Sequence, residues 1–349
     1  FFSFITKRYG VSAIQYIAVW GEQIDSIRSY SLHLLNDDGK IEKTALENVT
    51  FAIMDVQWLN NSKKIIFSSW EGPSYWAENV QHSLKLHNIK TSETKTLWQS
   101  NNNDVHVSEV SVSENDKISF VAGIYQGVRK ICVINPDGTG FKELLEIDAR
   151  DLKYIDDTIY FLTDIEDSLD DNYQVCRINE DGTGFRQILN TKGKGIFEFD
   201  ISPGEQTIIY DLAIKDLDEE VILYQCDIDG KNQTPIMNID SLPHIHIANL
   251  YFNHQTFSPD GGEILFGHNG AIMTIMNGET HSYRQIDFGV RCNLYTPTWY
   301  DNGKKIVFST NENSQTNICI INSHGSDYKV LYSNDFYSSD CFSVSPTYE

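Results

Sequence analysis

The chain has 349 residues, of which 27 are basic and 49 are acidic, so its formal net charge is −22. Such a surplus of negative charge repels the phosphate backbone of nucleic acids, whose partners bind it through Lys and Arg, so nucleic acid is excluded as an expected partner. No apolar run approaches the roughly 20 residues that cross a bilayer. Residues 1–9 carry no recognisable secretion signal, and we expect no membrane-spanning segment.

The N-terminal part of the chain predicts three strands without a convincing first one. These strands are residues 15–20, 31–35 and 41–46, which are rich in β-branched and aromatic side chains. The last two flank Asp38-Gly39, a dipeptide that supplies the positive φ of a tight hairpin turn. The first unit of the chain therefore lacks its opening strand.

Six further units follow, and each contains two hairpins. In chain order, the first hairpins lie at residues 59–67, 113–121, 154–161, 202–210, 258–266 and 300–308, and the second hairpins at 87–98, 134–145, 178–189, 226–237, 275–286 and 321–332. The turn glycines Gly138, Gly182, Gly230, Gly278 and Gly325 are 44, 48, 48 and 47 residues apart, and Gly39 lies 99 residues before Gly138. The longest spacing equals two periods, so the chain holds seven units of four strands each.

Four short antiparallel strands in every period, without helical spacing, predict an all-β fold. We expect residues 1–349 to form a single seven-bladed β-propeller of four-stranded antiparallel blades, because one small sheet cannot bury both faces until it stacks on its neighbours. The C-terminal residues 340–346 read as an opening strand with no blade after it. They are expected to pair with the N-terminal strands in one blade, which closes the ring and removes open sheet edges.

The two hairpin patterns resemble the repeat of TolB-type β-propellers. They are (S)PDG-x-x-I-x-F, as in residues 258–266, and I-N-x-DG-T-G-x-x-x-L, as in residues 134–145. The same repeat occurs in the propeller domains of prolyl oligopeptidase relatives and in oligogalacturonate lyases. The resemblance implies an extracytoplasmic platform for protein interaction or a scaffold for carbohydrate processing. TolB itself has a separate N-terminal α/β domain and a six-bladed ring, which the sequence does not predict here, so its envelope role is not carried over.

Four of the six cysteines share one strand position. Cys132, Cys176 and Cys319 lie six residues before a turn glycine, and Cys226 lies four residues before its own. Equivalent positions of neighbouring blades are farther apart than the roughly 7 Å between Cα atoms that a disulfide allows. We therefore expect these four thiols to be buried and unpaired.

Two acidic segments offer oxygen ligands for calcium. Asp227, Asp229 and Asn232 surround Gly230, but this string occupies the position of the hairpin turn in the other units, and a turn is therefore favoured. The second segment is an insertion between two strands, for which a solvated loop is favoured over a cation site, because the sequence does not show that its oxygens converge. Its acidic residues are Asp164, Glu166, Asp167, Asp170 and Asp171.

A long connection, residues 243–255, contains His244, His246 and His254. His-x-His on an extended segment points both imidazoles to one side, which is a geometry that metals use, but a polar loop with hydrogen-bonded histidines is favoured. The resemblance implies, for oligogalacturonate lyases, a metal held by histidines and by a glutamine three residues before a His-x-His pair. Ser241 stands at that place here, which argues against a lyase.

An aromatic insertion at residues 70–76 offers Trp70, Tyr75 and Trp76. It lies between the second and third strands of its unit, where loops of a rigid scaffold often carry binding residues. The rings could stack on sugars or on a protein partner, or they could fold down onto the ring.

The long insertions gather on one face of the expected ring. Residues 70–81, 164–172 and 213–220 join second to third strands and residues 238–251 join two blades, and these two classes of connection emerge on the same side of a propeller. Neither a G-x-S-x-G nucleophile elbow nor a Gly-rich phosphate loop occurs.

The sequence therefore predicts a non-catalytic, monomeric propeller that binds a protein or carbohydrate ligand through this face, with no cofactor. The expected ligand contacts are Trp70, Tyr75, Trp76, His244, His246 and His254. The acidic insertion favours a cationic partner or a bridging divalent metal, whose ligands the sequence does not identify. The alternative is a metal-assisted polysaccharide lyase or hydrolase with its site in the central funnel.

Overall fold

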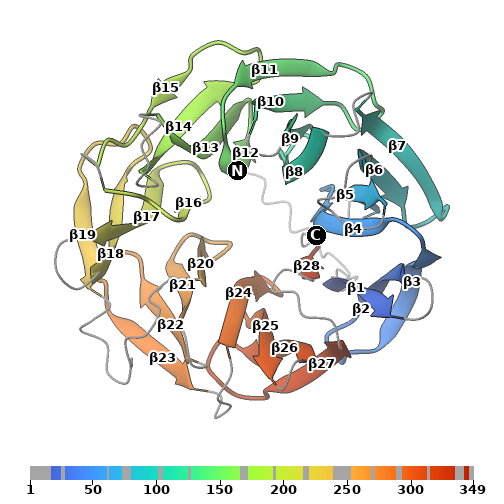
Figure 1. Ribbon diagram of the computed structural model, residues 1–349. Coiled ribbons are helices and arrows are strands. Elements are labelled where there is room, and N and C mark those ends of the chain that lie inside the picture. The colour runs from blue at the N-terminus through green and yellow to red at the C-terminus, as the bar shows by residue number, and fades with distance from the viewer. Residues whose placement is uncertain are drawn as a thin grey trace, which may run out of the picture.

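The computed structural model describes residues 17–345 except 25–27, 61–62, 73–79, 101–104, 125–126, 166–171, 192–193, 215–219, 239–252, 269–271, 288–292, 313–314 and 335–341. The described residues form seven four-stranded antiparallel sheets around a central axis (Figure 1), and none of them is helical. The expected all-β, seven-bladed propeller is confirmed.

Each sheet is a blade whose four strands succeed one another from the inner to the outer edge of the ring. The first blade holds β28 (Phe342–Val344), β1 (Ile17–Ile24), β2 (Arg28–Leu35) and β3 (Ile41–Val49), the second β4 (Ala52–Trp58), β5 (Lys64–Glu71), β6 (Gln81–Asn88) and β7 (Glu93–Gln99), and the third β8 (Val105–Val112), β9 (Ile118–Ile124), β10 (Arg129–Ile134) and β11 (Lys142–Glu146). The fourth holds β12 (Arg150–Ile155), β13 (Thr158–Asp164), β14 (Tyr173–Asn179) and β15 (Arg186–Gln187), and the fifth β16 (Phe199–Ile201), β17 (Thr207–Ile214), β18 (Glu220–Asp227) and β19 (Thr234–Asn238). The sixth holds β20 (Asn253–Phe257), β21 (Glu263–His268), β22 (Ile272–Asn277) and β23 (Tyr283–Asp287), and the seventh β24 (Asn293–Tyr300), β25 (Lys305–Glu312), β26 (Gln315–Asn322) and β27 (Lys329–Asn334).

The two ends of the chain share the first blade, as the sequence predicts. The C-terminal β28 pairs antiparallel with β1, with Val344 opposite Ile17 and Phe342 opposite Val19. The indole of Trp58 in the second blade donates a hydrogen bond of 3.3 Å to the carbonyl of Ser343. The closing strand is therefore held both within its own blade and by the next one.

The core lies between consecutive blades. One aromatic side chain in the second strand of each of six blades is at most 1% exposed. These residues are Phe67, Phe120, Phe161, Tyr210, Phe266 and Phe308. In the contact between the sixth and seventh blades, for example, Leu265 and Ile275 pack with Trp299 and Phe308. Each sheet thus buries its two faces against its neighbours, which is why the repeat needs the ring.

The inner strands contain bulges that the sequence did not predict. The pairing of the first with the second strand shifts its register between Met54 and Gln57, and equivalent shifts occur in four further blades. Residues with φ between 45° and 55° occupy four of these bulges. They are Asp55, Glu109, Asp151 and Thr296. A bulge of this kind turns one side chain out of the regular alternation of the strand.

The expectation for the four repeat cysteines is confirmed. Cys132, Cys176, Cys226 and Cys319 lie on the third strands of four blades, and all four are buried and outside any disulfide. Burial raises the pKa of the Cys132, Cys176 and Cys226 thiols to about 12, so they are protonated at neutral pH. They behave as small apolar side chains.

Candidate functional site

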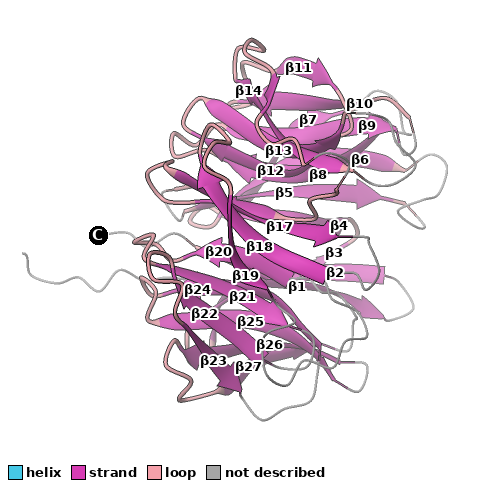
Figure 2. Cartoon of the chain, turned by 90° about the vertical axis from the view of Figure 1, so that its left-hand side faces the viewer, coloured by secondary structure: helices cyan, strands magenta, loops and turns pink. Residues whose placement is uncertain are grey.

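The connections of this ring differ sharply between its two faces. Connections from second to third strands and from one blade to the next leave on one face, and those from first to second and third to fourth strands leave on the other. The first face carries the connections at residues 72–80, 165–172, 215–219 and 239–252, and we call it the loop-rich face. Among the described residues, the connections on the second face are short turns, many of which are visible at one edge of the ring in Figure 2.

Trp70 does not lie on a loop, and this part of the sequence prediction is wrong. Strand β5 continues to Glu71, and Trp70 pairs with Ala52 on one side and His82 on the other. Its side chain is 8% exposed and belongs to the core between the first and second blades. The chain leaves the sheet only at Gly72, so the insertion begins two residues later than the sequence suggested.

Most of the other expected ligand contacts lie outside the described residues. These are Tyr75, Trp76, His244 and His246. His254 is the second residue of β20, and its side chain is also outside the described part. Of the acidic insertion, Asp164 ends β13, whereas Glu166, Asp167, Asp170 and Asp171 are not described.

The string around Gly230 is a hairpin turn, as favoured from the repeat. The amide of Asp227 donates to the carbonyl of Lys231 at 2.9 Å, and the side chain of Asn232 donates to Asp227 Oδ2 at 2.7 Å. Asp229 pairs with the Lys231 ammonium at 2.6 Å. The oxygens of this turn are therefore engaged by groups of the turn itself.

The structure brings together five acidic residues on or next to the innermost strands, which surround the centre of the ring in Figure 1. We call them the inner-strand carboxylates, and they are Asp55, Glu109, Asp151, Glu198 and Asp200. Sequence reasoning missed this set, although an acidic residue three or four positions before the end of the first strand recurs in consecutive blades. That recurrence was the available signal.

Several inner-strand carboxylates connect neighbouring blades. Glu109 Oε2 accepts the amide of Asp151 at 2.8 Å, and Asp151 Oδ2 accepts the amide of Phe199 at 3.5 Å. Asp200 Oδ2 accepts the amide of Phe257 at 2.9 Å. Each bond runs from one blade to the next, so these carboxylates help to hold the third to sixth blades in register.

The crowding of negative charge shifts the protonation of these groups. Burial, together with the carboxylates of Asp55 and Asp151, raises the pKa of Glu109 to about 7. Lys153 lies 2.9 Å from Asp151. Burial alone would lower the pKa of Lys153, but Asp151, Asp200 and Glu198 outweigh it and raise that pKa. The site therefore favours a cationic group, and Lys153 supplies one beside Asp151.

A further acidic residue, Asp211, lies on β17, next to the inner strand of the fifth blade. It is 1% exposed, and its Oδ1 accepts the amides of Phe197 at 3.0 Å and Glu198 at 2.8 Å. Burial, followed by repulsion from Glu198, raises the pKa of Asp211 to about 8. The acidic side chains of Asp211 and Glu198 therefore both lie at the backbone of residues 197–198.

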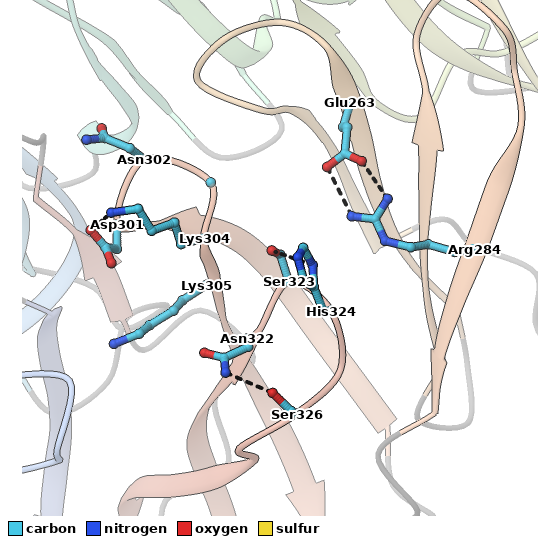
Figure 3. A pocket seen from close by; sticks show the side chains of 11 residues that line it. Glu263, Arg284, Asp301, Asn302, Lys304, Lys305, Asn322, Ser323, His324 and Ser326 are labelled. Atoms are coloured by element: carbon cyan, nitrogen blue, oxygen red, sulfur yellow. Dashed lines mark hydrogen bonds and ion pairs between the residues drawn. The ribbon is translucent and has the colours of Figure 1, made fainter.

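A shallow depression of about 770 Å³ lies on the opposite face, between the sixth and seventh blades (Figure 3). Arg284 and Glu263 form a bidentate ion pair there, with N to O distances of 2.5 and 3.1 Å. Asn322 donates to Ser326 Oγ at 2.9 Å, and Lys304 lies 3.5 Å from Asp301. These polar groups already pair with one another, so the depression is a weaker candidate than the loop-rich face.

Clustered metal ligands and long apolar helices are both missing from the part of the chain that the structure describes. No group of three or more His, Cys, Asp or Glu side chains in the described ranges gathers as a metal site. Nor does any described helix have the length and apolar character needed to span a membrane.

Comparison with known proteins relates the chain to others by its fold. No protein-family model matches the sequence, and no curated protein sequence matches it. Among solved structures, an oligogalacturonate lyase from Vibrio parahaemolyticus superposes with a TM-score of 0.63 at 12% identity over 87% of this chain and 86% of that one. TolB from Acinetobacter baumannii superposes with a TM-score of 0.53 at 14% identity over 90% of this chain.

The coverage of the larger proteins is partial. The chain spans 62% of that TolB and 47% of a prolyl endopeptidase that it matches with a TM-score of 0.59 at 12% identity. At such low identity these similarities show the propeller fold alone.

Proposed function

We propose that this propeller binds a protein or carbohydrate ligand through the loop-rich face and catalyses no reaction. The observation that carries the proposal is the unequal elaboration of the two faces, since four long connections leave one side of the ring and tight turns leave the other. Rigid scaffolds usually carry recognition on their variable loops. The resemblance to TolB-type propellers adds an extracytoplasmic location to the proposal.

The charge of the molecule favours a cationic ligand. The chain has a net charge of −22, and the inner-strand carboxylates concentrate part of it around the central axis. Negative potential of this kind attracts basic groups and accelerates their association at low ionic strength. A Lys- or Arg-rich protein segment is therefore the favoured partner, with an amino sugar as the carbohydrate counterpart.

The proposal is tested with two probe sets, a glycan array and a series of peptides of basic, neutral and acidic composition. Binding to the basic peptides is expected to weaken steeply with salt. In the double variant Tyr75→Ala/Trp76→Ala the affinity for the selected probe should fall at least tenfold, with the unfolding midpoint unchanged. The matched control is Phe141→Ala/Phe185→Ala, which removes two aromatic rings, 40% and 44% exposed, next to the tight turns.

Two outcomes would contradict the proposal. Equal loss of binding in both double variants would show that the loop-rich face is not the binding face. Metal-dependent cleavage of a glycan on the array would favour the alternative, a metal-assisted polysaccharide lyase or hydrolase.

A further inference from the structure

Two positions of the repeat are unusual in the fifth and sixth blades, because one holds a carboxyl group in the fifth and the other holds an amide in the sixth. The first position directly follows the buried aromatic of the second strand and holds Asp211 in the fifth blade. In the five other blades with such an aromatic, it holds an uncharged residue, namely Ser68, Val121, Leu162, Gly267 or Ser309. The propeller fold therefore does not require a carboxyl group at this place.

The second position lies in the inner strand, two or three residues before its end, and holds Gln255 in the sixth blade. The equivalent residues of four other blades are apolar and at most 7% exposed. They are Val56, Val110, Leu152 and Phe199. Gln255 is itself only 4% exposed, so a polar amide replaces an apolar side chain in the core. Burying an amide costs free energy unless its polar atoms find partners.

Asp211 and Gln255 meet at the same residue. Asp211 Oδ1 accepts the backbone amide of Glu198 at 2.8 Å, and Gln255 Nε2 donates to the backbone carbonyl of Glu198 at 2.8 Å. In the described part of the chain, neither Asp211 Oδ2 nor Gln255 Oε1 has a hydrogen-bond partner. Two buried oxygen acceptors thus lie around one peptide without any donor from the described residues.

The second blade shows one way in which a donor satisfies this arrangement. There the residues equivalent to Asp211 and Glu198 are Ser68 and Asp55, and the Ser68 hydroxyl donates to Asp55 Oδ2 at 3.0 Å. In the fifth blade both residues are acidic, and ionised carboxylates only accept hydrogen bonds. A positive charge beside them would give Asp211 Oδ2 the partner that it lacks and would also offset the cost of burying Asp211.

We propose that a calcium ion binds between the fifth and sixth blades through Asp211 Oδ2, Gln255 Oε1 and the Glu198 carboxylate. All three ligands are oxygens, and carboxylates combined with a side-chain amide are a typical calcium donor set. Water would complete the coordination. The ion would tie the two blades together where the connection 239–252 enters β20, and this role does not depend on the ligand proposed for the loop-rich face.

The test is calorimetric titration of the full chain with CaCl2 at pH 7.5 after removal of metals with a chelator. One ion is expected per chain, together with a rise in the thermal unfolding midpoint. Asp211→Asn and Gln255→Leu should each weaken calcium binding at least tenfold. Asn keeps the acceptor for the Glu198 amide, and Leu restores the apolar character of the other blades, so both variants should fold. Glu109→Gln, which changes the residue equivalent to Glu198 in the third blade, is the control and should bind within twofold of the wild type.

Three results would overturn the proposal. If the wild type binds no calcium and Asp211→Asn is more stable, Asp211 is a protonated structural acid. If Asp211→Asn and Gln255→Leu bind calcium as the wild type does, the ion lies elsewhere on this acidic protein. If Glu109→Gln weakens calcium binding as much as Asp211→Asn and Gln255→Leu do, calcium is attracted by the combined negative charge of the inner-strand carboxylates and not by a defined site.

Discussion

Glu109 couples the stability of the ring to pH. Its pKa is raised from 4.5 to about 7 in the folded protein, so the folded state holds a proton that the unfolded state has released. A raised carboxyl pKa means that the unfolding free energy falls as pH rises through this window, by at most about 1.4 kcal/mol per pH unit for one group. Glu109→Gln should flatten this slope between pH 4.5 and 7, measured by urea unfolding. Equal slopes in variant and wild type would contradict the assignment.

The burial of Trp70 has a measurable effect on stability. Because its side chain is 8% exposed and packed between the first and second blades, Trp70→Ala should lower the unfolding free energy by about 3 kcal/mol. Phe185→Ala, at a residue 44% exposed whose ring stacks on Phe161, is the control and should lower it by no more than about 1.5 kcal/mol. A small effect of Trp70→Ala on the free energy of chemical unfolding would show that this side chain is exposed and not part of the core.

The residues show where sequence reasoning succeeds and where it stops. The four repeat cysteines were placed correctly because a shared distance from the turn glycine fixes their strand. Trp70 was misplaced because Gly72-Pro73 signals a turn but not how far the preceding strand extends. The inner-strand carboxylates come close together only when neighbouring blades stack, because the contacts between them join different blades.

The hairpin turns differ in how much space they leave for a side chain at the turn glycine. Gly230 and Gly204 both have φ near 80°, which costs a non-glycine residue about 1 kcal/mol. A Cβ at Gly230 would lie 2.1 Å from the carbonyl oxygen of Ile188, whereas a Cβ at Gly204 would meet nothing within 4 Å. Gly230→Ala should therefore cost at least about 2 kcal/mol more than Gly204→Ala in thermal or urea unfolding. Equal costs would show that the turn relaxes away from the carbonyl of Ile188, which follows the outer strand of the fourth blade.

Near-identical sequences can still form unequal elements. INPDGTGFKELL ends in the five-residue β11, whereas INEDGTGFRQIL ends in the two-residue β15. In the second copy the amides of Ile188 and Leu189 both donate to the carbonyl of Val175, and the Gln187 side chain donates to the carbonyl of Leu189. The chain therefore leaves the sheet early. Local turn chemistry predicts that a hairpin exists, but the following connection decides how long its outer strand is.

For the whole molecule, the period of the repeat was sufficient to predict seven blades and their closure. Turn glycines and alternating strands are local signals, and they recur along the entire chain. The proposed calcium site could not be predicted from the sequence, because Asp211, Glu198 and Gln255 come from three separate segments and meet only when two blades stack. Their departure from the repeat becomes informative once the structure aligns the blades.

Closure of the ring depends on β28. Strand β28 is the inner strand of the first blade, where Phe342 is 8% exposed and packs with Ile17 and Leu35. Deleting residues 340–349 would remove this strand, expose the edge of β1 and withdraw the carbonyl that accepts from Trp58. The thermal unfolding midpoint should fall by several degrees and the truncated chain should associate through the open edge, as measured by light scattering. A shorter deletion of residues 346–349 keeps β28 and is the control. If the two truncated chains have the same midpoint and remain monodisperse, the ring does not depend on this strand.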